Sequence, residues 1–121
     1  MKPRKYPLRR VFTRKAVSTD FEYVETPPIR QGEVWEIHSH SFENETGARG
    51  TIRGYVRRGD NYHWLWEQAS PAQATLYWSH EDIFLAESEI LGVRQATNEA
   101  GDILQLKLNG VVIFDSEGQV V

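Results

Sequence analysis

The pattern of apolar and polar positions along the chain predicts a series of short β-strands joined by turns. Apolar and polar residues alternate around 17–23, 33–43, 49–58 and 104–108, and shorter apolar runs lie at 62–67, 72–78, 83–85 and 90–94. Alternation with a period of two is typical of strands, because successive side chains point to opposite faces of a sheet. No stretch has a convincing helical period. We therefore expect an all-β protein, an antiparallel β-sandwich of the jelly-roll type.

The stretch from Gly32 to Phe42 is predicted to be the central strand of the core. A strict period of two places Trp35 and Ile37 on one face and Val34 and Phe42 on the other. Two hairpins are predicted from their turn residues, one at 59–61 and a stronger one at 109–110. The second is an Asn-Gly pair, which a two-residue hairpin loop favours because both central residues need positive φ. A last short strand is expected at 119–121.

Length and composition narrow the class of protein. A chain of 121 residues corresponds to one domain. It contains no cysteine, which excludes a disulfide framework, a thiolate metal site and a cysteine nucleophile. There is no run of about 18 apolar residues and no apolar region of a secretory signal near residue 1, so we expect neither a membrane span nor contact with a membrane.

Charge divides the chain into two unequal parts. Residues 1–15 carry seven bases and no acid, whereas the rest of the chain carries seven bases against 17 acids. We therefore expect an extended basic N-terminal arm at 1–15 and a sandwich domain at 16–121. An acidic body is a poor surface for phosphates, so the expected partner is another protein and not nucleic acid. The candidate partner-binding residues of this arm are Lys2, Arg4, Lys5, Tyr6, Leu8, Arg9, Arg10, Phe12, Arg14 and Lys15.

Two histidines on the central strand are candidates for metal chemistry. His38 and His40 stand two apart on a predicted strand, so their imidazoles leave the same face and can share a metal ion. With Glu45, their spacing resembles the first metal motif of the cupins, which are also jelly rolls. However, Ile52 stands where that motif closes with glycine, and the second cupin motif is missing. We therefore expect no metal and no cofactor, and we keep a cupin-type metal-dependent enzyme as an alternative.

Aromatic residues gather at 62–66 and 77–78. By a period of two, Tyr62, Trp64 and Trp66 share one strand face. Such rings fill sandwich cores and protein interfaces, and an exposed row of them can also stack on sugars. The first role is favoured, and a glycan-binding module remains a second alternative.

Most of the predicted sandwich resembles a group of small β-sandwich proteins from the virions of tailed bacteriophages and prophages. The resemblance runs from 28 to 114 and rests on five motifs, namely Gly32-Glu33-Val34-Trp35, Asn44-Glu45-Thr46, Glu67-Gln68-Ala69-Ser70-Pro71-Ala72, Leu76-Tyr77-Trp78 and Gly101-Asp102-Ile103-Leu104-Gln105-Leu106. It implies a non-enzymatic structural protein of the virion, first a capsid decoration (cement) protein and next a neck, tail or fibre-attachment component. The implied partners are the major capsid protein or neck and tail subunits, and the implied assembly is a homo-oligomer, either a trimer or a ring.

Overall fold

The chain forms nine strands in the part that the structure, a computed structural model, describes. This part covers residues 3–17, 20–47, 49–69 and 71–115, so Lys2 and the strand expected at 119–121 lie outside it. The strands are β1 (Pro3–Lys15), β2 (Glu22–Glu25), β3 (Glu33–Asn44), β4 (Ile52–Arg58), β5 (Asn61–Gln68), β6 (Tyr77–Ser79), β7 (Ile83–Leu85), β8 (Ile90–Gln95) and β9 (Ile103–Asp115). These residues contain no helix, and thus none that is long and apolar enough to cross a membrane.

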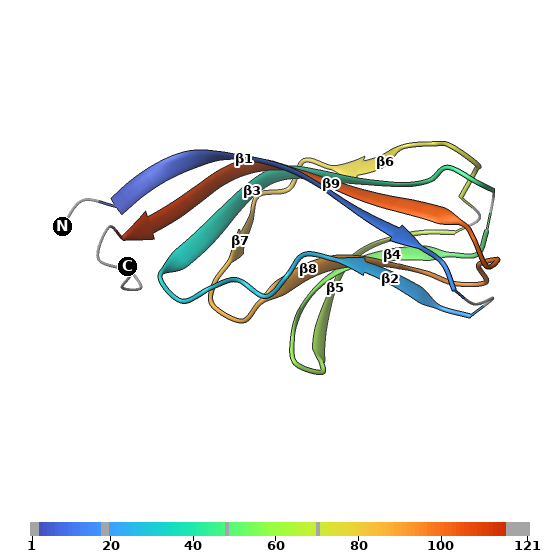
Figure 1. The fold of residues 1–121 in the computed structure, drawn as a ribbon, viewed down its shortest axis with the longest axis horizontal. Coiled ribbons are helices and arrows are strands. Elements are labelled where there is room, and N and C mark those ends of the chain that lie inside the picture. Colours follow the sequence, from blue (N-terminus) through green and yellow to red (C-terminus); the bar gives the residue numbers. More distant parts are fainter. Residues whose placement is uncertain (1–2, 18–19, 48, 70, 116–121) are drawn as a thin grey trace.

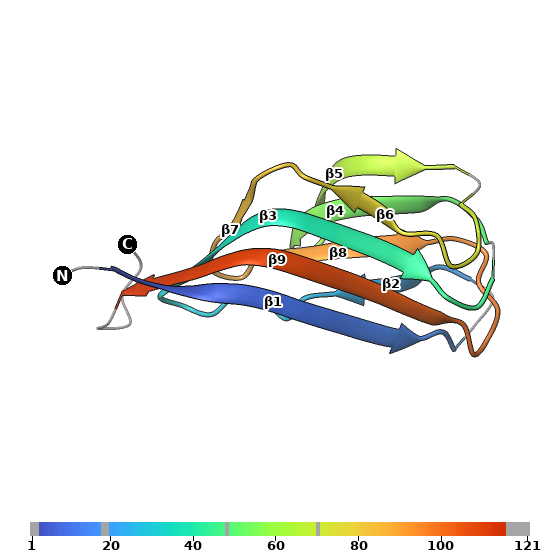
Figure 2. The same cartoon turned by 90° about the horizontal axis from the view of Figure 1, so that it is seen from above.

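Two antiparallel sheets pack face to face (Figures 1 and 2). Sheet A has the order β1-β9-β3-β6, with β7 also paired to β3, and sheet B has the order β2-β8-β4-β5. Strands far apart in sequence are therefore neighbours, with the first strand next to the last. The strand orders β1-β9-β3-β6 and β2-β8-β4-β5 are those of a jelly roll, which is built from two Greek keys. The predicted fold class is confirmed.

The core lies between the sheets and is made mostly of aliphatic side chains. Residues that are completely buried include Ile37 of β3, Ile52 of β4, Leu91 of β8 and Leu106 of β9. Together they come from both sheets, as the alternation of apolar positions requires. Burial of such side chains is the main stabilising contribution in a sandwich of this size.

Strand β3 does not keep a strict period of two. Its pairing with β9 shifts between Ile37 and Ser39, which makes His38 the extra residue of a β-bulge. Beyond the bulge the alternation is inverted, because one added residue exchanges the two faces of a strand. As a result Trp35, Ile37 and Phe42 all point into the core. The prediction that Phe42 and Trp35 lie on different faces of the strand is wrong.

One of the two predicted hairpins is present. β4 and β5 are joined by the tight turn at Gly59–Asp60, where Gly59 has a φ of 57°. Asn109–Gly110, in contrast, is not a turn, because β9 runs through it as one continuous strand. Gly110 pairs with Ile37 beside the bulge of β3. The absence of a side chain at Gly110 lets β9 and β3 approach each other closely. The prediction of a hairpin at this position is wrong.

The segment predicted as an extended basic N-terminal arm separate from the sandwich is instead an edge strand of sheet A. β1 pairs with β9 along its whole length, from Pro3 opposite Asp115 to Lys15 opposite Ile103. The sequence of this strand shows no alternation of apolar and polar residues, because only Leu8 of residues 4–15 is buried. The extended conformation is as expected, but residues 3–15 belong to sheet A and do not stand apart from the sandwich.

Candidate functional site

The two histidines of the proposed metal motif point to opposite sides of sheet A. His38, at the bulge, is exposed, and its Nδ1 lies 3.5 Å from Asp82 Oδ1. His40 is 1% exposed and accepts a hydrogen bond at Nε2 from Trp66 Nε1, over 2.8 Å. Glu45 lies beyond the end of β3 and is exposed. The bulge separates the imidazoles, so these three residues do not form the site that the cupin resemblance implied.

The pH dependence of stability should reveal the burial of His40. Burial lowers the pKa of His40 to about 4, whereas its ordinary value is 6.5. Between these pH values the unfolded chain binds a proton that the folded protein does not, so stability should fall as the pH falls through this window. We expect His40 to contribute a loss of about 2 kcal/mol between pH 7 and pH 4.5.

Urea unfolding of the wild type and of His40→Gln at these two pH values measures this contribution. Glutamine keeps a hydrogen-bond acceptor for Trp66 but does not titrate, so the variant should lose less stability than the wild type in acid. Carboxylates titrate in both proteins and cancel in the comparison. Equal losses in the two proteins would contradict a neutral, buried His40.

Aromatic and arginine side chains cover the outer face of sheet B. Tyr62 and Trp64 are stacked with their ring centroids 5.3 Å apart and their planes 14° apart. The guanidinium groups of Arg53 and Arg94 lie 4.9 Å and 4.8 Å from the centroid of Trp64. We call these four residues the aromatic layer. Its rings contact one another and the arginines, so the faces of the Trp64 indole are largely occupied within the protein.

Trp66 does not belong to the aromatic layer. The pairing of β4 with β5 shifts between Gly54 and Tyr55, so that Trp66 lies opposite Gly54 and Trp64 lies opposite Tyr55. Trp66 packs against the core and reaches His40 of the other sheet. The prediction that Tyr62, Trp64 and Trp66 share one face is therefore wrong, again because a bulge inverts the alternation.

A buried tyrosine and an ion pair lie next to the aromatic layer. Tyr55 donates a hydrogen bond to Glu25 Oε2 at 2.6 Å, and Arg57 donates to both oxygens of Glu25 at 2.7 and 3.0 Å. Tyr55 reaches Glu25 across β8 because Gly92 is there, and a Cβ on Gly92 would lie 2.6 Å from its hydroxyl. Burial opposes the charge of Glu25, but these hydrogen bonds outweigh it and lower its pKa.

The residues of the predicted partner-binding arm that the structure describes all lie on β1. Leu8 is buried, Phe12 is half-buried and Tyr6 is 45% exposed and stacked on Phe114 with centroids 5.2 Å apart. Arg14 pairs with Glu22 at 2.8 Å. Among the side chains that the structure describes, no salt bridge joins the other cations of β1 to a carboxylate. These exposed cations are Arg4, Lys5, Arg9, Arg10 and Lys15.

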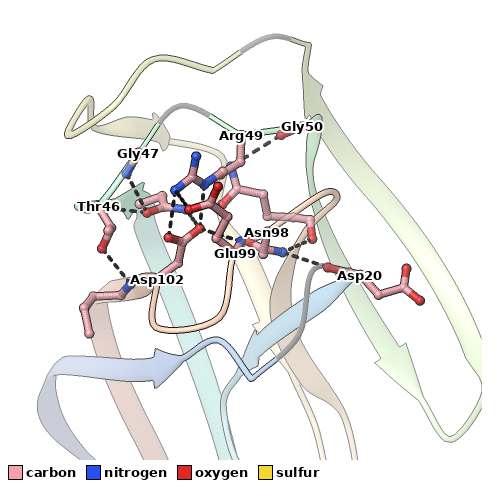
Figure 3. Close-up of polar contacts among 11 residues, drawn as sticks. Asp20, Thr46, Gly47, Arg49, Gly50, Asn98, Glu99 and Asp102 are labelled. Atoms are coloured by element: carbon pink, nitrogen blue, oxygen red, sulfur yellow. Dashed lines mark hydrogen bonds and ion pairs between the residues drawn. The ribbon is translucent and has the colours of Figure 1, made fainter.

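A buried polar cluster closes one end of the sandwich (Figure 3). Asp102, which is 1% exposed, accepts hydrogen bonds from Arg49 at 2.8 and 3.1 Å and from Asn44 Nδ2 at 3.3 Å. Asn44 Nδ2 also donates to Gln95, and Asn98 donates to the carbonyl oxygen of Gln95. The pKa of Asp102 is lowered, and the hydrogen bonds from Arg49 make the largest contribution to this shift. We call this cluster the Asp102 network, and its contacts join loops that follow β3 and β8.

A groove on the outer face of sheet A was not predicted from the sequence. It has a volume of about 220 Å³ and lies beside Trp78, which is 62% exposed. Trp78 pairs with Ser41 of β3, and Ser41 points outward because its neighbours His40 and Phe42 are buried. The residues that line this Trp78 groove are Ser39, His40, Ser41, Leu76, Trp78, His80, Lys107, Leu108 and Asn109. The sequence shows the indole, but its neighbours on β3 and β9 follow only from the register of the sheet.

Comparisons with known proteins place the chain in no established family. No family model matches it, and no curated protein is significantly similar in sequence. Among solved structures it is similar to a variant of a family 29 carbohydrate-binding module, with 14% identity and a TM-score of 0.44 over 84% of this chain and 68% of that one. A family 4 carbohydrate-binding module shows 12% identity and a TM-score of 0.37 over 84% of this chain and 80% of that one.

The structure of infectious bursal disease virus, Gx strain, is also similar. It shows 12% identity and a TM-score of 0.40 over 93% of this chain, which spans a third (33%) of the viral chain. At these values the likenesses do not reach beyond the general fold, so a proposal of function must rest on the residues of this chain.

Proposed function

We propose that this protein is a non-catalytic structural protein of a bacteriophage virion, first of all a capsid decoration protein that binds its neighbours through β1. The observation that carries the proposal is the long, exposed and cationic edge of sheet A. The resemblance of residues 28–114 to virion proteins of tailed bacteriophages supports the same function and is the reason for choosing a virion as the assembly. A neck, tail or fibre-attachment component is the next candidate, because the same edge suits any neighbour in a virion.

β1 offers its outer edge to a partner. It is the terminal strand in the order of sheet A, so the main-chain groups on its free side have no strand beside them in the described structure. Natural sheets often protect such edges with charged residues and proline, which partly explains Pro7 and the basic residues. Protection alone does not explain Tyr6 and Val11, which are 45% and 56% exposed on the same strand. Exposed tyrosine together with arginine is typical of protein interfaces.

The paired ends of β1 and β9 extend beyond sheet B (Figures 1 and 2). The stacked rings of Tyr6 and Phe114 lie on this extension. An extension of this kind lets β1 contact a neighbour without disturbing the core. The cations on it favour an acidic surface, either on another subunit type or on a second copy of this chain in a trimer or ring.

Composition of purified particles tests the proposal. Virions from a host that carries this gene, banded on a density gradient, should contain the protein at a fixed copy number by quantitative mass spectrometry. Electron microscopy of antibody-labelled particles then distinguishes the two candidates. A decoration protein should be labelled over the whole shell, and a neck or tail component only at the neck or tail. Presence of the protein in the lysate but not in banded particles would overturn the assignment to the virion.

A pair of charge-reversal variants tests the role of β1. Arg9→Glu/Lys15→Glu should leave the melting temperature nearly unchanged, because both side chains are exposed, but should prevent incorporation into particles. Arg58→Glu is the control, since it reverses an exposed cation of sheet B and should be incorporated normally. Normal incorporation of the β1 variant would show that the contact is made by another surface.

A further inference from the structure

We propose that the Trp78 groove binds a neutral sugar residue of an oligosaccharide. This site goes beyond the function proposed above and is independent of β1. The groove lies where β6 pairs with β3, at the edge of sheet A opposite to β1. The inference rests on an open indole beside a small hollow that is lined by hydrogen-bonding side chains.

The Trp78 indole is available to a ligand. It is 62% exposed, and His80 contacts it with ring centroids 4.3 Å apart and planes 88° apart. This edge-to-face contact covers at most one face of the indole. Trp64 is different, because Tyr62 and two guanidinium groups already occupy its surroundings. Trp78 is therefore better placed than Trp64 to stack on the C–H face of a pyranose ring.

The rest of the groove supplies polar groups for sugar hydroxyls. Strand β3 provides the hydroxyls of Ser39 and Ser41, and β9 provides the amide of Asn109. The residue after β6 provides the imidazole of His80. Lys107 also lines the groove, but its Nζ lies 3.6 Å from Glu43 Oε1. Because that carboxylate balances the ammonium group, the site favours an uncharged ligand.

The size of the groove agrees with one sugar ring. Its volume of about 220 Å³ is below the roughly 300–1,000 Å³ of pockets that enclose drug-sized ligands. A second hollow of about 350 Å³ adjoins it, and Leu76 and Trp78 line both. Because the second hollow shares the indole and also reaches residues of β5, a second sugar bound there would add contacts, and we expect an oligosaccharide to bind more tightly than a monosaccharide.

Glycan binding should be measured with the full chain on an array of neutral and acidic oligosaccharides, followed by calorimetry with the neutral compound that binds best. Affinity should be modest, with a dissociation constant on the order of 1 mM to 10 μM, because few groups contact the ligand. Trp78→Ala should weaken binding at least tenfold without changing the unfolding curve. Phe84→Ala is the matched control, because Phe84 is 61% exposed on the same face but does not line the groove.

Each outcome decides the proposal. Trp78-dependent binding of a neutral oligosaccharide, unaffected by Phe84→Ala, supports it. No binding on the array, binding of acidic glycans only, or loss of binding in Trp64→Ala in place of Trp78→Ala overturns it. Arg9→Glu/Lys15→Glu should bind the oligosaccharide normally, so a failure of the proposed β1 contact and a failure of the sugar site are separate results.

Discussion

Gly110→Ala is expected to destabilise the protein by about 3 kcal/mol or more. A Cβ at this position would lie 2.0 Å from the carbonyl oxygen of Glu36 and 2.9 Å from the Cα of Ile37. Both atoms belong to the main chain of β3, so no side chain can move aside to relieve the clash. The central strands of sheet A would have to separate at the bulge, where the main chain of β3 lies against Gly110.

Asn109→Ala is the control for this prediction. Asn109 precedes Gly110 in β9 and is exposed, so its substitution should change stability by no more than about 0.5 kcal/mol. Urea unfolding at neutral pH measures both variants. A Gly110→Ala protein as stable as Asn109→Ala would mean that the two strands are farther apart at this point than the structure places them.

Asp102→Ala is expected to cost about 3 kcal/mol. The carboxylate accepts hydrogen bonds from Arg49, from Asn44 and from the main-chain nitrogen of Glu99 (3.1 Å). Its removal leaves buried donors without their acceptor and leaves the charge of Arg49 without its main partner. The loss should be smaller than for a fully buried ion pair, because Arg49 is 20% exposed and can turn toward water.

Two further variants identify what the network requires. Glu99→Ala removes the other carboxylate near Arg49, at 3.2 Å, but this group is 71% exposed and its loss should have little effect. Asp102→Asn keeps the shape of the side chain and removes the charge, so its stability should lie between those of the wild type and Asp102→Ala. If Asp102→Ala unfolded at the same urea concentration as Glu99→Ala, the network would not contribute to stability.

The sandwich could be predicted from the sequence because its signal is spread over many residues. Alternation of apolar and polar positions at 104–108 in β9 correctly indicates a strand with one buried face, where Leu104, Leu106 and Leu108 are buried. The hairpin at Gly59 is also specified locally, since a glycine with positive φ is needed there. Features of this kind depend on neighbours in sequence, which a single chain displays directly.

The bulges could not be predicted, since each depends on the partner strand. His38 is an ordinary strand residue in the sequence, and only the fit of β3 to Gly110 shows that it is the extra residue. The second bulge, between β4 and β5, likewise moves Trp66 from the expected outer face to the core. Each of the two candidate sites chosen by a period of two therefore combined residues that lie on opposite faces, His38 with His40 and Trp66 with Tyr62 and Trp64.

The edge strand was missed for a different reason. β1 has exposed residues on both faces, so it lacks the alternation that identifies other strands, and its prolines and cations resemble those of a free arm. Its partner, β9, is the last strand of the described chain. The Trp78 groove was missed for a related reason, because its walls come from β3, β6 and β9 and meet only through sheet pairing.

The pairing of the first strand with the last has a consequence for synthesis of the protein on the ribosome. β1 leaves the ribosome before β9 and has no partner until β9 has been translated, so sheet A cannot be completed before residues 103–115 are made. Contacts between segments so distant in sequence slow folding, since a long loop must close before they form. During this wait β1 is an unpaired strand, and its cations and Pro7 reduce the risk that nascent chains associate through it.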